Sequence, residues 1–142
     1  RRPLMSRPES FAPRFVVSLP IEDRRRSLRF YEEALGLEAF GPIADDGVPE
    51  PLQFALSDDV GLMLVPTGGF GWVVGRELAP PGRSEVLLSV GVGSPAEVDD
   101  LVARAVDAGA MVVSPAEAKP WGYSAVLADP DHHALMVTAG PG

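Results

Sequence analysis

The chain has 142 residues, of which 46% are hydrophobic and 23% charged. This composition is typical of a globular domain with one sizeable core and excludes a disordered or fibrous protein. The net charge of −8 is uneven, because residues 1–29 hold eight arginines against three acidic residues and the remainder holds four basic residues against seventeen acidic ones. Since nucleic acid requires a basic face, we expect no nucleic-acid partner.

The sequence also gives expectations for location. No uncharged apolar stretch approaches the roughly 20 residues that cross a bilayer, and the first residues lack the apolar centre of a secretory signal. The chain has no cysteine, which agrees with a reducing compartment. We therefore expect a cytoplasmic protein without a membrane partner. Residues 1–13 are broken by proline and lack periodicity, which predicts a loose leader.

The first half of the chain predicts a strand, a helix and three further strands. Residues 14–21 are apolar and β-branched, and residues 24–35 place apolar side chains at helical spacing before a stop at Gly36. Turn-forming residues then separate three short apolar segments, which we expect to form an antiparallel meander: 37–40, 52–57 and 61–66.

The second half repeats this plan. Residues 85–92 predict a strand, and Ser94, Pro95 and Glu97 form a capping box that begins a helix ending at Gly109. Three more strands are predicted at 110–116, 122–129 and 133–139. The order of elements in the two halves is the same, which indicates two βαβββ units in tandem.

We therefore expect an α+β protein in which two tandem βαβββ units form curved mixed sheets around a central pocket. The first unit spans residues 14–65, the second spans residues 85–139, and together they make one domain over 14–139. Each sheet is too small to close on itself, so two sheets pack about a pseudo-twofold axis.

A glycine- and proline-rich segment, residues 66–84, connects the units. A connection of this length inside a compact domain is usually functional or disordered. Its aromatic residues Phe70 and Trp72, set among five glycines, suit a flap over a pocket. A linker, or an arm that contacts a second chain and buries Trp72, is an equally weighted alternative.

Two stretches, LPIEDRRRSLRFYEEALGLE (19–38) and ADPDHHALMV (128–137), carry a family resemblance. The chain resembles the vicinal oxygen chelate superfamily, which includes glyoxalase I, extradiol dioxygenases and bleomycin and fosfomycin resistance proteins. Within it, the second half is most similar to an uncharacterised group of glyoxalase-like proteins. The resemblance runs from Arg14 to Ala139 and implies the two-unit fold and a homodimer. It does not specify an activity, because one scaffold hosts many chemistries.

The resemblance also implies where a divalent metal would be held. The ligands in the family are drawn from the first and fourth strands of each unit, and carried over by position they fall on four apolar residues: Val16, Met63, Leu87 and Met136. Metal catalysis needs several hard or borderline donors around one ion. We therefore predict no metal and no cofactor at these positions.

Strand alternation places the same four residues on a face lined by small and flexible side chains, which leaves room for an apolar guest. Aromatic residues nearby suit stacking at the mouth. The predicted ligand-binding residues are Val16, Ser18, Met63, Phe70, Trp72, Leu87, Ser89, Trp121, Tyr123 and Met136. The alternative is that these side chains complete a closed core.

The only two histidines, His132 and His133, follow the turn-forming sequence DPD. We favour a turn there over a metal site, since neighbouring strand residues point to opposite faces and Asp129 and Asp131 bond their own backbone. No nucleophile motif is present, and TGGFGWVVG lacks the residues of a phosphate loop. Catalytic residues stay unassigned, because nothing in the spacing of the carboxylates selects one of Glu50, Asp58, Asp59 and Glu117.

The leading hypothesis is thus a protein that binds a small apolar or aromatic molecule, resembles the bleomycin resistance proteins and has no metal. A second hypothesis is a lyase or dioxygenase with a displaced metal site that uses His132 and nearby acids. A third is a protein-interaction module with a filled core. A ligand-dependent change in tryptophan fluorescence, a stoichiometric metal and the absence of a cavity would respectively favour the three.

Overall fold

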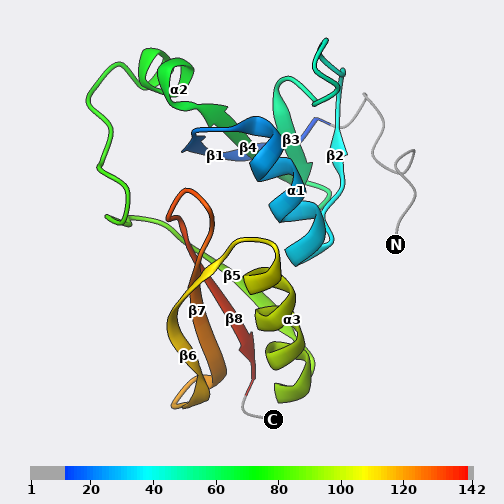
Figure 1. Ribbon diagram of the computed structural model, residues 1–142, viewed down its shortest axis with the longest axis vertical. Coiled ribbons are helices and arrows are strands. Elements are labelled where there is room, and N and C mark those ends of the chain that lie inside the picture. Colours follow the sequence, from blue (N-terminus) through cyan, green and yellow to red (C-terminus); the bar gives the residue numbers. More distant parts are fainter. Residues whose placement is uncertain (1–11, 141–142) are drawn as a thin grey trace. The chain divides into compact units, whose positions relative to one another are not determined.

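The computed structural model describes residues 12–140 and divides into two compact units, with the main boundary between Leu78 and Ala79 (Figure 1). Each unit holds a four-stranded mixed sheet, in the order β1-β4-β3-β2 for the first and β5-β8-β7-β6 for the second. The prediction of two βαβββ units of the α+β class is confirmed. Of the leader expected over residues 1–13, residues 1–11 lie outside the described part of the chain.

The first unit begins with the parallel pair of β1 and β4 and continues with antiparallel pairs of β4 with β3 and of β3 with β2. Its elements are β1 (Phe15–Ile21), α1 (Arg24–Leu35), β2 (Ala39–Phe40), β3 (Leu52–Ala55), β4 (Val60–Pro66) and α2 (Thr67–Val74). The helix α2 lies inside the segment that the sequence analysis left without secondary structure.

Helix α1 has well-defined ends. The side chain of Asp23 accepts a hydrogen bond from the Arg26 N–H at 3.1 Å, and Gly36 takes the left-handed conformation (φ 68°) that ends the helix. The ring of Tyr31 lies 5.8 Å from that of Phe54 on β3, centroid to centroid, and both side chains are buried. This aromatic contact fixes the apolar side of α1 against one face of the sheet.

An ion pair and hydrogen bonds made by Arg24, at the start of α1, hold the loop between β2 and β3. Arg24 pairs with both carboxylate oxygens of Asp46, at 2.9 and 3.2 Å, and donates to the carbonyl of Val48 at 2.8 Å and to that of Pro49. The hydrogen bond between Arg24 and Asp46 raises the pKa of Arg24. The same bond, together with the one from the N–H of Val48, lowers the pKa of Asp46 below its ordinary value. Both shifts favour the charged forms, so these contacts are strongest when Arg24 and Asp46 are both ionised.

The second unit repeats the topology of the first, with β5 parallel to β8, and β8–β7 and β7–β6 antiparallel. Its elements are β5 (Leu87–Val92), α3 (Pro95–Asp107), β6 (Met111–Lys119), β7 (Gly122–Ala128) and β8 (Ala134–Ala139). The predicted capping box is present, because the Ser94 side chain accepts from the Glu97 N–H at 3.2 Å and Glu97 accepts from the Gly93 N–H at 3.3 Å.

Helix α3 covers one face of its sheet (Figure 1). Its buried residues Val98, Leu101 and Ala105 follow helical spacing. They face a buried row from β7 and β8 that comprises Ala125, Leu127, Leu135, Val137 and Ala139. No helix within residues 12–140 has both the length and the apolar character that a membrane span requires.

The ionised Arg24–Asp46 pair gives a pH-dependent prediction. Replacing Asp46 by Asn should lower the urea midpoint near pH 7. Because the pKa of Asp46 is lowered in the folded state, its contribution is present above its unfolded pKa of about 3.9 and is lost as the pH falls through the folded value. The gap in urea midpoint between the wild type and the Asp46→Asn variant should therefore narrow at about pH 3. Asp45→Asn, one residue away and exposed, is the matched control; a constant gap across this pH range would contradict the account.

Candidate functional site

The sheet of the first unit has one face covered by α1 and one face that no helix covers along its length. Ser18 pairs with Met63, Met63 pairs with Gln53, and Val16 pairs with Gly61. Because cross-strand partners point to the same side, these residues share one face. We call the following set open face 1: Val16, Ser18, Pro20, Gln53, Gly61, Met63 and Val65. Of the alternate residues, Leu19 on β1 and Leu62 and Leu64 on β4 are buried.

The second unit has an equivalent face. Ser89 pairs with Met136, and Met136 pairs with Val126, on the side opposite α3. We call open face 2 the set Leu87, Ser89, Gly91, Ser124, Val126, Ala128, Ala134, Met136 and Thr138. Leu87 is 50% exposed and Met136 is half-buried, whereas Leu135 and Val137 on the helix side are fully buried. Each unit therefore exposes apolar side chains on one face of its sheet.

The four residues that the family resemblance assigns to metal positions lie on these faces. Met63 has Ser18 directly beside it, and Met136 has Ser89 beside it, while Val16 and Leu87 lie one row further along. Thioether, hydroxyl and alkyl groups are poor ligands for the metals that carboxylate and imidazole bind. Within residues 12–140, no three His, Cys, Asp or Glu side chains are grouped so that they could hold a metal ion.

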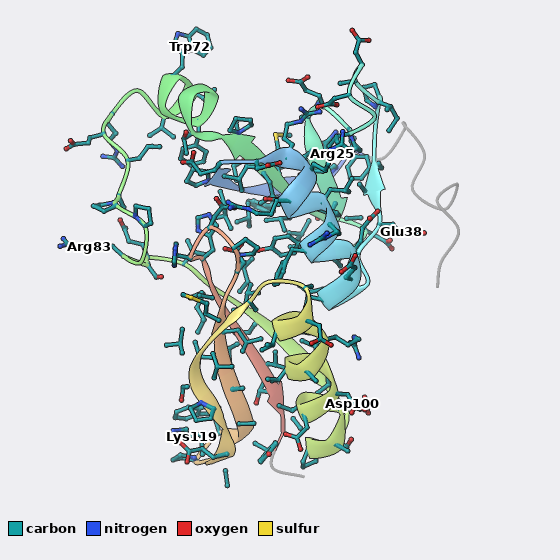
Figure 2. All side chains as sticks on the ribbon, in the orientation of Figure 1. Arg25, Glu38, Trp72, Arg83, Asp100 and Lys119 are labelled. Atoms are coloured by element: carbon teal, nitrogen blue, oxygen red, sulfur yellow. The ribbon has the colours of Figure 1, made fainter. Side chains whose placement is uncertain are left out.

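Phe70 and Trp72 lie on α2, next to the end of β4. Helix α2 contacts β1 and β4, and a Cβ on Gly69 would lie 3.6 Å from Cγ1 of Val65 on open face 1. Phe70 is half-buried there. Trp72 is 86% exposed and points away from the ribbon of its own unit (Figure 2). Of the two aromatic residues, Phe70 is thus the less exposed.

Of the two aromatic residues expected at the mouth in the second unit, Tyr123 lies on the other side of the sheet. It pairs with buried Ala139, and its hydroxyl donates to Asp99 of α3 at 2.9 Å. This hydrogen bond raises the pKa of Tyr123. Tyr123 therefore braces the helix against the sheet, and we leave it out of the candidate site. Trp121 lies at the tip of the β6–β7 hairpin and is 54% exposed.

The two histidines belong to a tight turn between β7 and β8. The carboxylate of Asp129, which is 2% exposed, accepts from the N–H groups of Asp131 at 2.8 Å and His133 at 2.9 Å. His132 takes a positive φ of 70°, and its N–H donates to the Asp129 carbonyl at 2.8 Å. The aspartate that a metal would need is therefore occupied by backbone donors, as the turn interpretation predicts.

One feature of open face 2 was missed by the sequence analysis. Strand β6 has two irregularities in its pairing with β7, between Val112 and Ser114 and between Ser114 and Glu117. They bring Ser114 beside Val126 and Glu117 beside Ser124, which adds polar groups to this face. Pro115 in the middle of the strand was the available signal, because proline interrupts a ladder and accompanies bulges.

The comparisons with known proteins agree with this geometry. A family model described as a glyoxalase-like domain matches residues 15–138. No curated protein matches the chain. The chain belongs to the glyoxalase-like domain family, within the vicinal oxygen chelate superfamily.

Three solved structures illustrate the likeness. A glyoxalase-related enzyme from Fulvimarina pelagi is 29% identical, with a TM-score of 0.75 over 89% of this chain and 86% of that one. A glyoxalase/bleomycin resistance protein/dioxygenase family enzyme from Burkholderia phytofirmans PsJN is 18% identical, with a TM-score of 0.71 over 91% and 99%. TnmS3, an antibiotic binding protein from Streptomyces sp. CB03234, is 24% identical, with a TM-score of 0.61 over 91% and 95%. The likeness of this chain to the last two structures is a likeness of fold.

The DPD turn gives a stability prediction. Asp129→Ala should lower the free energy of unfolding by about 1–3 kcal/mol, since it leaves two backbone N–H groups without their acceptor. Asp129→Asn keeps one acceptor oxygen and should cost less. His132→Gly should raise the free energy of unfolding by about 0.5–1 kcal/mol, because glycine adopts the left-handed conformation without strain. Urea titration measures all three variants, and a destabilised His132→Gly protein would show that the histidine side chain has a further role.

Proposed function

We propose that this protein binds a small apolar or aromatic molecule on its open sheet faces and uses no metal to do so. The observation that carries the proposal is the place of Val16, Met63, Leu87 and Met136, the four apolar residues that the family resemblance assigns to metal positions, on the sheet faces opposite α1 and α3. Methionine adapts its shape to an irregular guest, and neighbouring hydroxyls supply sparse polar anchors.

The recurrence of one side-chain arrangement in both units supports this function. The same arrangement of a serine beside a methionine recurs as Ser18 with Met63 and as Ser89 with Met136. A purely structural core would bury such residues, whereas Ser18 and Ser89 are exposed and both methionines are half-buried. That the same fold carries an antibiotic in TnmS3 is compatible with small-molecule binding here. The homodimer and the cytoplasmic location expected from the sequence stay part of the proposal.

An enzyme with a displaced metal site at His132 is less well supported. Asp129, an acidic residue of the same turn, is buried, and its carboxylate accepts from two backbone N–H groups. Moving that carboxylate to a metal would break the turn that joins β7 to β8. Metal analysis of the untagged protein separates the two functions: the binding proposal predicts far less than one Ni, Zn, Fe or Mn per chain, and a stoichiometric metal lost in His132→Ala would overturn it.

Ligand binding gives the direct test. A panel of aromatic and amphipathic compounds should contain some that raise the melting temperature saturably, since a ligand at 100 times its Kd adds about 2.7 kcal/mol to stability. Met63→Gln or Met136→Gln should weaken binding of such a compound about tenfold, or about 1.4 kcal/mol. Val106→Gln on the exposed side of α3 is the matched control and should bind normally. No saturable response from any compound would contradict the proposal.

A further inference from the structure

We propose that open face 2 selects an uncharged aromatic molecule that carries a hydroxyl or carbonyl oxygen on one edge. This inference rests on the proposed function and specifies the class of ligand. It comes from three independent features of the second unit: a gradient from apolar to polar rows across the sheet, a fixed hydroxyl pair at its polar end, and an unfilled space beside that pair.

The gradient follows from the register of the four strands. Successive rows, in the order β5, β8, β7 and β6, are Leu87, Ala134, Ala128 and Met111; then Ser89, Met136, Val126 and Ser114; then Gly91, Thr138, Ser124 and Glu117. The first row is entirely apolar, the second is mixed, and the third has three polar side chains. A guest that lies along the strands therefore meets alkyl groups at one end and hydrogen-bonding groups at the other.

The polar end is held in place. The hydroxyl oxygens of Ser124 and Thr138 lie 3.0 Å apart, and Ser124 Oγ also lies 3.5 Å from the carbonyl oxygen of Gly122; Ser124 is only 2% exposed, so its rotamer is fixed by packing. Thr138 is half-buried. When Ser124 directs its single proton to the closer acceptor, Thr138 Oγ1, rather than to the more distant Gly122 carbonyl, the proton of Thr138 is available to donate. In that arrangement a ligand oxygen would accept from Thr138 and complete the hydrogen bonding of the hydroxyl pair.

Space for such an oxygen lies beside Thr138. Gly91 is its partner on β5, and a Cβ built on Gly91 would meet no atom within 4 Å. Open face 1 differs, because the corresponding position on β1, two residues after Ser18, is Pro20, which pairs with Val65. The second unit thus has no side chain beside Thr138, at a position where the first unit has a proline ring.

Charge argues for a neutral ligand. Lys119, at the end of the β6–β7 hairpin (Figure 2), forms an ion pair with Glu117 at 2.9 Å. This pair neutralises the one cation on the polar end of open face 2 among the described residues. A carboxylate ligand would have to displace Glu117 from Lys119 and approach a chain of net charge −8. A hydroxyl or carbonyl ligand carries neither cost.

The test uses three matched probes, 2-naphthol, 2-methylnaphthalene and 2-naphthoate, with binding followed by NMR chemical-shift titration of the full chain. We expect 2-naphthol to bind at least fivefold more tightly than either of the others. Thr138→Val, which preserves shape and removes the hydroxyl, should abolish the advantage of 2-naphthol over 2-methylnaphthalene. Gly91→Leu should prevent binding of all three, and Thr67→Val, which changes a half-buried threonine of the first unit, is the matched control.

The outcomes separate this inference from the proposed function. If 2-naphthol and 2-methylnaphthalene bind equally well and Thr138→Val changes neither, the polar selection is wrong while binding on the open faces stands. Tightest binding by 2-naphthoate would also overturn the neutral class. If no probe binds and no compound of the aromatic and amphipathic panel raises the melting temperature, the proposed function itself fails. The dispersion of the NMR spectrum shows whether Thr138→Val and Gly91→Leu are folded.

Discussion

The constraint on which the structure depends is that a β-sheet has two faces and each unit's sheet-covering helix, α1 or α3, can cover only one of them. A strand places successive side chains on opposite sides, so every choice that buries one residue against the helix turns its neighbours to the other side. In the second unit, burial of Leu135 and Val137 against α3 requires Met136 and Thr138 to face away. The candidate site is thus a direct consequence of the core.

The same constraint explains why the two units present similar chemistry. Each has a parallel pair of first and fourth strands, and in each a serine lies beside a methionine on the uncovered face. The family resemblance assigns metal positions to these faces. With thioethers and alkyl groups in those positions, the faces lose affinity for a metal and gain affinity for apolar surface. A change of function then needs only side-chain replacements on strands that the core already holds.

Much of the fold could be predicted from the sequence because its signals are local. Asp23 and Gly36 mark the ends of α1, Ser94 and Glu97 cap α3, and period-two alternation assigns the faces of β4 and β8. The turn at Asp129 was predictable for the same reason, since aspartate bonds its own backbone.

Features that depend on long-range pairing were not predictable. The irregularities in β6 shift its register so that Glu117 lies on open face 2. The alternation of apolar and polar residues along the sequence does not predict where such a shift occurs. Tyr123 was expected at the mouth of a pocket because an exposed aromatic suits stacking, but the register with β8 turns it toward Asp99 of α3. Helix α2 has three glycines among eight residues, so its propensity is low and its formation depends on contact with β1 and β4.

The central claim is that the uncovered faces around Met63 and Met136 receive an apolar guest. Proton–carbon NMR of the methionine methyl groups tests it most directly, because Met63 and Met136 each give one methyl signal and each lies on one of the two faces. Titration with an aromatic compound that stabilises the protein should shift the methyl signals of Met63, Met136 or both in a saturable way. Saturable binding that leaves both methyl signals unchanged would place the ligand elsewhere and contradict the account.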